Sequence, residues 1–228
     1  NNVPKPKFPR IIFTDDAWIF NTNPPIKASD LREKVVNGYA DTGGALWWST
    51  GDHEVYHFET KIGEIFGFQQ QSHQDLDHLH SFVHSAGGDD SYPKIAANVH
   101  ALIDESGGPL NTMLEACREK GIPFFPRIRM NSHYVIDSSH PAYGNYRRQH
   151  PDRLISGPDE RFPEGTIEHG IGTGLDYTHP ENRNFITSII CECFERFDVD
   201  GVELDFMRHP AFFRIEEGFA NRHFMTSL

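Results

Sequence analysis

The sequence predicts an α/β fold in which helices cover a parallel sheet of four strands. Four short segments rich in β-branched and aromatic residues alternate with segments whose apolar residues recur at helical spacing. The 228 residues are 37% hydrophobic and 12% aromatic, a composition typical of globular proteins. We therefore expect one domain over residues 1–228, built from four βα units.

The first βα unit and the second strand come from the N-terminal fifth of the chain. Residues 10–16, RIIFTDD, follow a proline-rich lead and predict the first strand. Ser29 is expected to cap the next helix, whose apolar residues form one stripe that ends near Gly43. Residues 45–49, ALWWS, then predict a short second strand.

Two further helices and two further strands continue the alternation. One helix is expected from Pro109 to Gly121, a glycine that should take a left-handed backbone conformation at the helix end. Residues 123–131 predict the third strand. A capping box at Thr178 predicts the next helix, and residues 201–206 predict the fourth strand.

The connections between these elements are asymmetric. Helix-to-strand connections are short, whereas the strand-to-helix connections near residues 50–108 and 132–177 are far longer than the usual 2–6 residues. The first insertion contains a predicted helix at residues 93–105. In βα folds these connections emerge at the carboxyl ends of the strands, so we expect the functional site there.

Four βα units are half of what a closed barrel contains, and such a barrel normally takes about 250 residues. Residues 1–10 contain neither an initiator Met nor a signal-peptide pattern, so we expect the true N-terminus to be absent. Residues 218–228 predict a helix without a stop signal. We therefore expect the N-terminal half of a longer barrel, truncated at the C-terminus. The alternative is an open four-stranded sheet covered by its long loops.

Composition excludes several classes of protein. A formal net charge of −12 disfavours nucleic acid as a partner, and no apolar run is long enough to predict a membrane span. The three cysteines fit neither a disulfide framework nor a metal site, so we expect small buried hydrophobic residues. The sequence leaves the oligomeric state undefined and the compartment open, including a secreted or periplasmic one.

The fourth strand carries the clearest chemical signal. If Val202 and Leu204 face the helices, the two-residue period places Glu203 and Asp205 together on the interior face. Mutual repulsion and desolvation would then keep a proton on one carboxyl group near neutral pH, as acid/base catalysis requires. In the alternative interpretation Glu203 pairs with an inward arginine and Asp205 caps a turn.

The third strand offers positive charge on the same face. Arg127, Arg129 and Asn131 alternate with apolar residues, so they should share the interior face, with His133 just beyond. We expect Arg127 to neutralise the carboxylates and Asn131 and His133 to bind a ligand. Forked hydrogen bonds from the arginines to hydroxyl, carboxylate or sulfate groups of a ligand are a second possibility.

Other polar and aromatic residues are predicted at the strand ends. Tryptophan beside carboxylates suits a carbohydrate site, because sugar rings lie well on aromatic faces. Trp47 and Trp48 face opposite sides of their strand, so one of them should be plain core. The candidate substrate-binding residues outside the third strand are Asp15, Asp16, Trp18, Trp47, Arg208 and His209.

Histidines in the first insertion offer a metal-binding alternative. His80 and His84 would lie one turn apart on a helix and could share a divalent ion with an acidic residue. No known ligand motif fits this spacing, and a solvated polar helix explains it equally well. We therefore expect no metal. Phosphate-binding glycine loops and dinucleotide fingerprints are not present either, so we expect no cofactor.

Residues 175–210, LDYTHPENRNFITSIICECFERFDVDGVELDFMRHP, resemble a segment of the glycosyl-hydrolase-like barrel proteins often described as family-10-like. The shared features are a Leu-Asp pair, a Pro-x-x-Arg helix start, and an Arg-Phe-Asp-Val-Asp-Gly run before a strand that ends in aspartate. Residues 114–123 are similar to the family's junction between its second helix and third strand. Phe206 and Glu203 depart from the pattern, where relatives often have an acidic residue and a histidine.

The resemblance implies a TIM barrel and glycoside hydrolysis, with Asp205 in the place of the family's strand-four aspartate. We therefore expect an enzyme that cleaves a poly- or oligosaccharide through two carboxylates, Asp205 and Glu203. The two arginines suggest an anionic glycan as a secondary expectation. The alternatives are a non-catalytic carbohydrate-binding barrel and a metal-dependent hydrolase.

Overall fold

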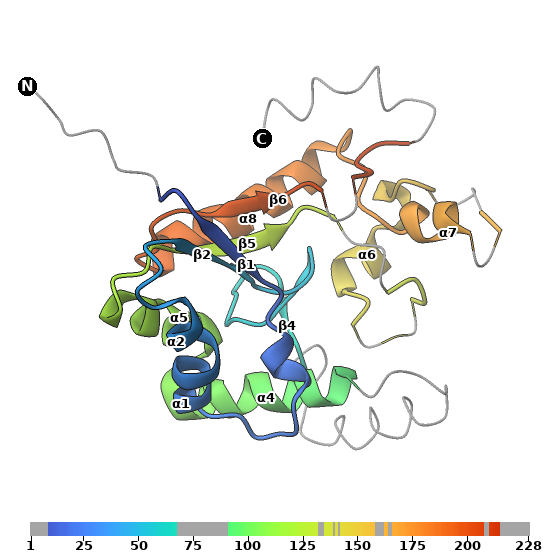
Figure 1. Cartoon of the computed structure of the whole chain (residues 1–228). Coiled ribbons are helices and arrows are strands. Elements are labelled where there is room, and N and C mark those ends of the chain that lie inside the picture. The colour runs from blue at the N-terminus through green and yellow to red at the C-terminus, as the bar shows by residue number, and fades with distance from the viewer. Residues whose placement is uncertain are drawn as a thin grey trace, which may run out of the picture.

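A computed structural model describes residues 9–67, 91–131, 135–138, 140, 142–157, 162–163, 166–207 and 210–214. Its centre is a four-stranded sheet in the order β1-β2-β5-β6, with every neighbouring pair parallel (Figure 1). The strands are β1 (Ile12–Asp15), β2 (Ala45–Ser49), β5 (Phe124–Arg129) and β6 (Glu203–Asp205). The predicted α/β fold with a parallel sheet is confirmed, and the chain-order arrangement of strands is that of half a (β/α)8 barrel.

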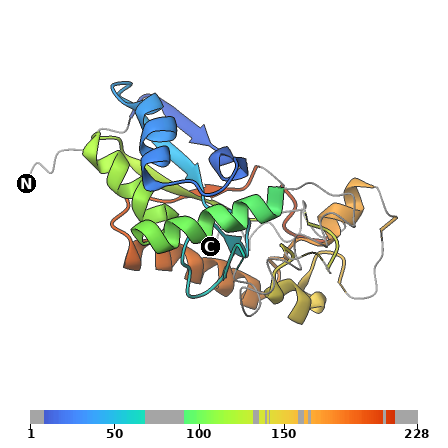
Figure 2. The same ribbon diagram turned by 90° about the horizontal axis from the view of Figure 1, so that it is seen from below.

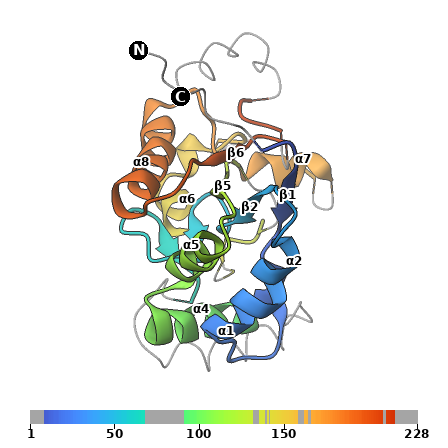
Figure 3. The same ribbon diagram turned by 60° about the vertical axis from the view of Figure 1, so that its left-hand side comes forward.

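Helices cover one face of this sheet. The first runs without a break through α1 (Ala28–Asp30), the π-helical η2 (Leu31–Val36) and α2 (Asn37–Tyr39). Helices α5 (Pro109–Glu119) and α8 (Pro180–Arg196) follow it around the sheet (Figure 3). Helix α4 (Ser91–Ser106), the helix predicted in the first insertion, packs against α5 and is prominent in the view from below (Figure 2).

The hydrophobic core lies between the sheet and these helices. Alternate strand residues such as Leu46, Trp48, Phe124 and Ile128 are buried there, which is the two-residue period predicted from the sequence. The other strand residues alternate with them on the opposite face, which we call the site face. Its members are Ile12, Thr14, Ala45, Trp47, Ser49, Phe125, Arg127, Arg129, Glu203 and Asp205.

Short elements within the two insertions were not predicted. Strands β3 (Val55–Tyr56) and β4 (Glu64–Ile65) pair with each other, and η3 (Pro151–Arg153) follows α6. Helices α6 (Asn145–Gln149) and α7 (Ile167–Gly172) lie beyond the carboxyl ends of the sheet strands (Figure 1). Each element is too short to leave a periodic signal in the sequence.

Two predicted helix caps are wrong, and one helix end is confirmed. Helix α1 begins after Lys27, so Ser29 lies within its first turn. Helix α8 begins after His179 instead of Thr178, because the Thr178 amide donates to the side chain of Asp176 in the preceding turn, at 2.9 Å. Gly121 has φ +66° directly after α5, the left-handed conformation expected there.

Cys117 and Cys193 are buried as expected, whereas Cys191 is exposed on α8. All three are free thiols. Among the described residues, no helix has the length and apolar character needed to cross a membrane. The helix predicted at residues 218–228 lies outside the described part of the chain.

Candidate active site

The sheet register brings the charged residues of two strands together. Arg127 of β5 is aligned with Glu203 of β6, and Arg129 with Asp205. Partners in a parallel pair point to the same side of the sheet, so all four side chains lie on the site face. The polar face predicted for the third and fourth strands therefore forms one cluster at their carboxyl ends.

Arg127 is the centre of this cluster. Its Nε lies 3.0 Å from Glu203 Oε2, its Nη2 lies 3.1 Å from Asp205 Oδ2, and its Nη1 donates to Asp16 Oδ1 at 3.0 Å. One guanidinium group therefore holds the carboxylates of three residues from β6 and from the end of β1. The expected neutralising role of Arg127 fits this geometry.

Arg129 forms a second, adjoining set of ion pairs. Its Nη1 donates to Asp52 Oδ1 at 3.2 Å, and its Nη2 lies 3.9 Å from Asp16 Oδ1. Asp52 was not among the residues predicted from the sequence. It lies in the connection that follows β2, as Asp16 lies in the connection that follows β1. That shared position after a parallel strand is the signal that could have found it.

The three carboxylates around Arg127 differ in exposure. The side chain of Asp16 is 37% exposed, that of Glu203 12% and that of Asp205 3%. Burial raises the pKa of Glu203 from its ordinary value of 4.5 to about 7, with Arg127 opposing the rise and Asp205 and Asp16 adding to it. Glu203 can therefore hold a proton near neutral pH, as predicted for one member of the pair.

Asp205 also has a local structural role. Its Oδ1 accepts from the Met207 amide at 3.1 Å, while Oδ2 faces Arg127. The alternative interpretation therefore fits in part, because Glu203 pairs with an inward arginine and Asp205 caps a turn. Both carboxylates nevertheless belong to one cluster, because each contacts Arg127.

Asp15 and Asp16 have different surroundings. Asp15 Oδ1 accepts from the Ala17 amide at 2.8 Å, and Oδ2 accepts from the Tyr39 hydroxyl at 3.1 Å. Asp15 thus ties β1 to α2 on the helix side of the sheet and lies away from the cluster. Ala17 has φ +58°, a left-handed conformation that is unfavourable for alanine and turns the chain sharply after Asp16.

The tryptophans divide as the strand alternation predicts. Trp48 is fully buried in the core, while Trp47 lies on the site face next to Thr14 and Phe125 in the register. Trp18 belongs to the short helix η1 (Trp18–Asn21) that follows β1, and it is 72% exposed. Trp18 and Trp47 are thus the indoles that a ligand could reach.

Asn131 has another role from the one expected. It is buried, its Nδ2 donates to the carbonyl oxygens of Leu175 and Ala211 at 3.0 and 2.8 Å, and its Oδ1 accepts from the Leu175 amide at 2.8 Å. The side-chain amide therefore joins the ends of two loops. We do not include Asn131 among the residues proposed to bind substrate. His133, Arg208 and His209 lie outside the described residues.

The predicted metal alternative on His80 and His84 also lies outside the described residues. Within the part of the chain that the structure does describe, no group of three or more His, Cys, Asp or Glu side chains is placed to hold a metal ion.

Comparison with known proteins identifies the family. The family model described as glycosyl hydrolase-like 10 matches residues 94–217, more than half of the chain. The chain belongs to the glycosyl hydrolase-like 10 family. The matched range includes Arg127, Arg129, Glu203 and Asp205, whereas Asp16 and Asp52 precede it.

Similar solved structures include two glycoside hydrolases. Alpha-L-fucosidase isoenzyme 2 from Paenibacillus thiaminolyticus is 13% identical, with a TM-score of 0.47 over 85% of this chain and 23% of that chain. The noncanonic maltogenic alpha-amylase AmyB from Thermotoga neapolitana is 11% identical, with a TM-score of 0.45 over 85% of this chain and 38% of that chain. This member of the glycosyl hydrolase-like 10 family thus spans a minor part of each structure, and no curated protein matches it.

Proposed function

We propose that the cluster around Arg127 is the active site of a glycoside hydrolase that acts on a poly- or oligosaccharide. The observation that carries the proposal is the convergence of Asp205, Glu203 and Asp16 on one guanidinium group at the carboxyl ends of the strands. Glycoside hydrolysis commonly uses two carboxyl groups, one as acid and one as nucleophile or base. Family membership supports the same chemistry.

The two catalytic carboxyl groups have distinct proposed roles. Glu203, with its pKa raised to about 7, donates its proton to the glycosidic oxygen as the bond from that oxygen to the anomeric carbon breaks. Asp205, held by Arg127, stabilises the positive charge that develops on the sugar ring. The water that adds to the anomeric carbon loses a proton to a carboxylate of the pair, which balances the hydrolysis.

Substrate contacts are proposed at the exposed edge of the cluster. Asp16 is the most accessible of the three carboxylates on Arg127 and can accept hydrogen bonds from sugar hydroxyl groups. Trp18 and Trp47 offer aromatic faces on which sugar rings can lie. Asp16 and Trp18 flank the strained Ala17, and strained backbone of this kind is often found at ligand sites.

We propose a neutral glycan as the substrate. The expectation of an anionic glycan depended on free positive charge from Arg127 and Arg129. In the described cluster these two arginines face four carboxylates, those of Asp16, Asp52, Glu203 and Asp205. An anionic sugar would meet an excess of negative charge there, which disfavours its binding.

The substitution Asp205→Asn tests the catalytic role. We expect turnover of neutral oligosaccharides to fall by about 10²–10³-fold, because the developing positive charge loses its counter-charge. Release of reducing ends is measured on wild type and variant, with circular dichroism to confirm that both are folded. Near-normal turnover by a folded Asp205→Asn protein would contradict the proposal.

A non-catalytic carbohydrate-binding barrel is the second candidate. The low exposure of Asp205 and its bond to the Met207 amide favour it, because a purely structural ion network would show the same features. Titration calorimetry and product analysis on the same glycans separate the two functions. Binding by wild type without product release would support the second candidate.

A further inference from the structure

A buried ion pair outside the cluster joins the two long insertions. Glu54 lies in the loop after β2 and Arg147 lies in α6, and both side chains are 1% exposed. Arg147 Nε donates to Glu54 Oε1, and the other Glu54 oxygen accepts from the Arg147 amide at 3.2 Å. Removing one partner of such a pair is strongly destabilising, because the remaining charge is left buried.

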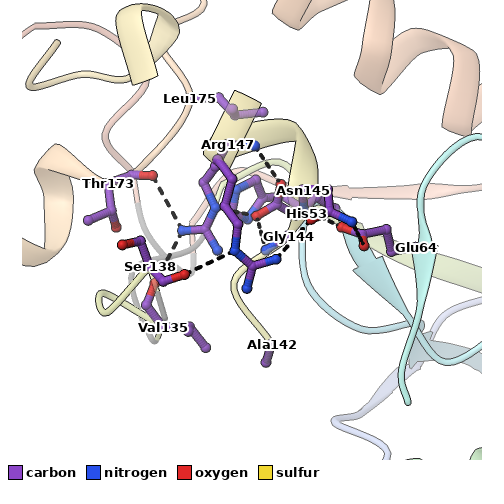
Figure 4. Close-up of polar contacts among 12 residues, drawn as sticks. His53, Glu64, Val135, Ser138, Ala142, Gly144, Asn145, Arg147, Thr173 and Leu175 are labelled. Atoms are coloured by element: carbon purple, nitrogen blue, oxygen red, sulfur yellow. Dashed lines mark hydrogen bonds and ion pairs between the residues drawn. The ribbon is translucent and has the colours of Figure 1, made fainter. Parts of the chain in front are cut away.

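The residues labelled around this pair in Figure 4 all come from the two insertions. Arg147 Nη1 donates to the carbonyl oxygens of Val135 and Thr173, at 3.2 and 3.4 Å, and its guanidinium lies 4.0 Å from the centre of the Tyr143 ring. The Gly144 amide donates to Glu54 Oε1 at 2.9 Å. A β-carbon at Gly144 would lie 2.1 Å from Glu54 Cδ, so this close approach requires glycine.

The Glu54 segment is a tight loop that also carries Asp52. The Asp52 amide donates to the Val55 carbonyl at 2.8 Å, and the His57 amide donates to the Thr50 carbonyl at 2.7 Å. Gly51 has φ +122°, and a β-carbon there would lie 2.5 Å from the Val55 carbonyl oxygen. The loop is thus closed on itself, and Asp52 is fixed relative to Glu54.

The two acidic residues of this loop contact opposite partners. Asp52 pairs with Arg129 in the candidate active site, at 3.2 Å, whereas Glu54 pairs with Arg147 of the second insertion. The base of the loop is joined to the sheet, because the Thr50 amide and hydroxyl both donate to the Arg127 carbonyl, at 3.2 and 3.0 Å. Movement of the loop would therefore require the buried pair to break.

We propose that Asp52 is a further residue of the active site and that Glu54 and Arg147 are positioning residues that hold it against Arg129. This inference rests on the proposed function, because it assigns the buried pair to the preorganisation of that site. Arg129 also approaches Asp16, at 3.9 Å, so a misplaced Asp52 would disturb the accessible edge of the cluster. A displacement of about 1 Å in such an arrangement can lower turnover by about 100-fold.

The test compares Asp52→Asn and Glu54→Gln, singly and together, with a matched control. Glu192→Gln is the control, because Glu192 is also a buried glutamate and pairs with Arg196 at 2.5 Å. Its carboxylate accepts from the Thr60 hydroxyl and the Lys61 amide, which lie outside the Asp52 loop. We expect Asp52→Asn and Glu54→Gln each to lower kcat by about 10- to 100-fold. The double variant should have the same kcat as Asp52→Asn, because both substitutions remove one function. Glu192→Gln should lower the melting temperature with kcat unchanged.

A second readout does not depend on turnover. The Nε–H signal of Arg129 in ¹⁵N-labelled protein should shift in both Asp52→Asn and Glu54→Gln, and stay in place in Glu192→Gln. If wild type hydrolyses no glycan but these shifts occur, the proposed function fails while the positioning of Arg129 stands. If Glu54→Gln leaves both kcat and the Arg129 signal unchanged, the inference is overturned.

Arg147→Lys keeps the experiment decisive if Glu54→Gln does not fold. Lysine retains the positive charge but loses the forked geometry that bonds Glu54, Val135 and Thr173 together. We expect a folded protein with lower kcat and a shifted Arg129 signal. Wild-type kcat and an unshifted signal in folded Arg147→Lys would also overturn the inference.

Discussion

Glu203 differs from an ordinary surface glutamate because it lies partly buried among other carboxylates. Its contact with Arg127, at 3.0 Å, favours the charged form, while burial and the neighbouring Asp205 and Asp16 disfavour it. Burial is the largest effect, so the pKa rises to about 7. The two-residue period of β6 predicted this pairing of Glu203 with Asp205, although it could not measure the burial.

The stability of the protein should therefore depend on the protonation of Glu203. Between pH 4.5, the ordinary pKa of glutamate, and about pH 7, Glu203 keeps a proton in the folded state and releases it in the unfolded state. The contribution of Glu203 to the free energy of unfolding thus falls as pH rises through this window. Glutamine does not titrate, so this contribution is constant in Glu203→Gln. As pH increases from 4.5 to 7, the free energy of unfolding of the variant should therefore rise by up to roughly 3 kcal/mol relative to that of wild type.

Urea unfolding of wild type and Glu203→Gln at several pH values from 4.5 to 8 measures this difference. Glu115→Gln serves as the control, because the Glu115 side chain is 65% exposed on α5, one of the helices that cover the face of the sheet opposite the cluster. A constant difference between wild type and Glu203→Gln across the range would show that the pKa of Glu203 is not raised.

At the scale of single elements, the helix ends show where sequence rules succeed and where they fail. The left-handed Gly121 was predicted because few other residues take positive φ without strain. The caps at Ser29 and Thr178 were misassigned by one or two residues, since nearby Asp30 and Asp176 side chains bond the Lys27 and Thr178 amides. Helix boundaries often depend on such competing local bonds.

Two glycine substitutions of opposite expected sign test this account of the helices. Neither Gly38 nor Gly121 has an atom within 4 Å of the position that a β-carbon would take, so backbone conformation decides the effect. Gly38→Ala, within α2, should stabilise the protein by about 0.5–1 kcal/mol. Gly121→Ala, at φ +66°, should destabilise it by about 1–2 kcal/mol.

Thermal or urea unfolding gives both values on one scale. Equal effects of the two alanine substitutions, or a stabilising Gly121→Ala, would be inconsistent with the left-handed end of α5.

For the whole molecule, the sequence predicted the sheet better than the loops. Regular periodicity identified all four strands of the β1-β2-β5-β6 sheet. The rule that βα connections lie at the carboxyl ends of the strands predicted the location of the charged cluster. The Glu54–Arg147 pair joins two residues that are 93 positions apart in the sequence, so no local sequence pattern predicts it. The pairing of Asp52 with Arg129, 77 positions away, was likewise not predicted, although the place of Asp52 in the connection after a parallel strand could have marked it as a candidate.

The parallel sheet and the two insertions contribute different residues to the candidate active site. The parallel sheet presents Arg127, Arg129, Glu203 and Asp205, and the two insertions supply Asp52 together with the buried pair that holds it. We propose that residues 1–228 form one (β/α) barrel unit in which the insertions complete the site. Family membership and the parallel sheet are consistent with this arrangement.

The pH dependence of kcat/KM tests the central claim most directly. Because Glu203 must be protonated to act as the acid, kcat/KM of wild type should fall above about pH 7. Glu203→Gln should lose this limb and should retain far more activity on substrates with an activated leaving group, which need no protonation, than on unactivated oligosaccharides. Persistence of the limb in Glu203→Gln, or equal losses on both kinds of substrate, would contradict the assignment of Glu203 as the acid.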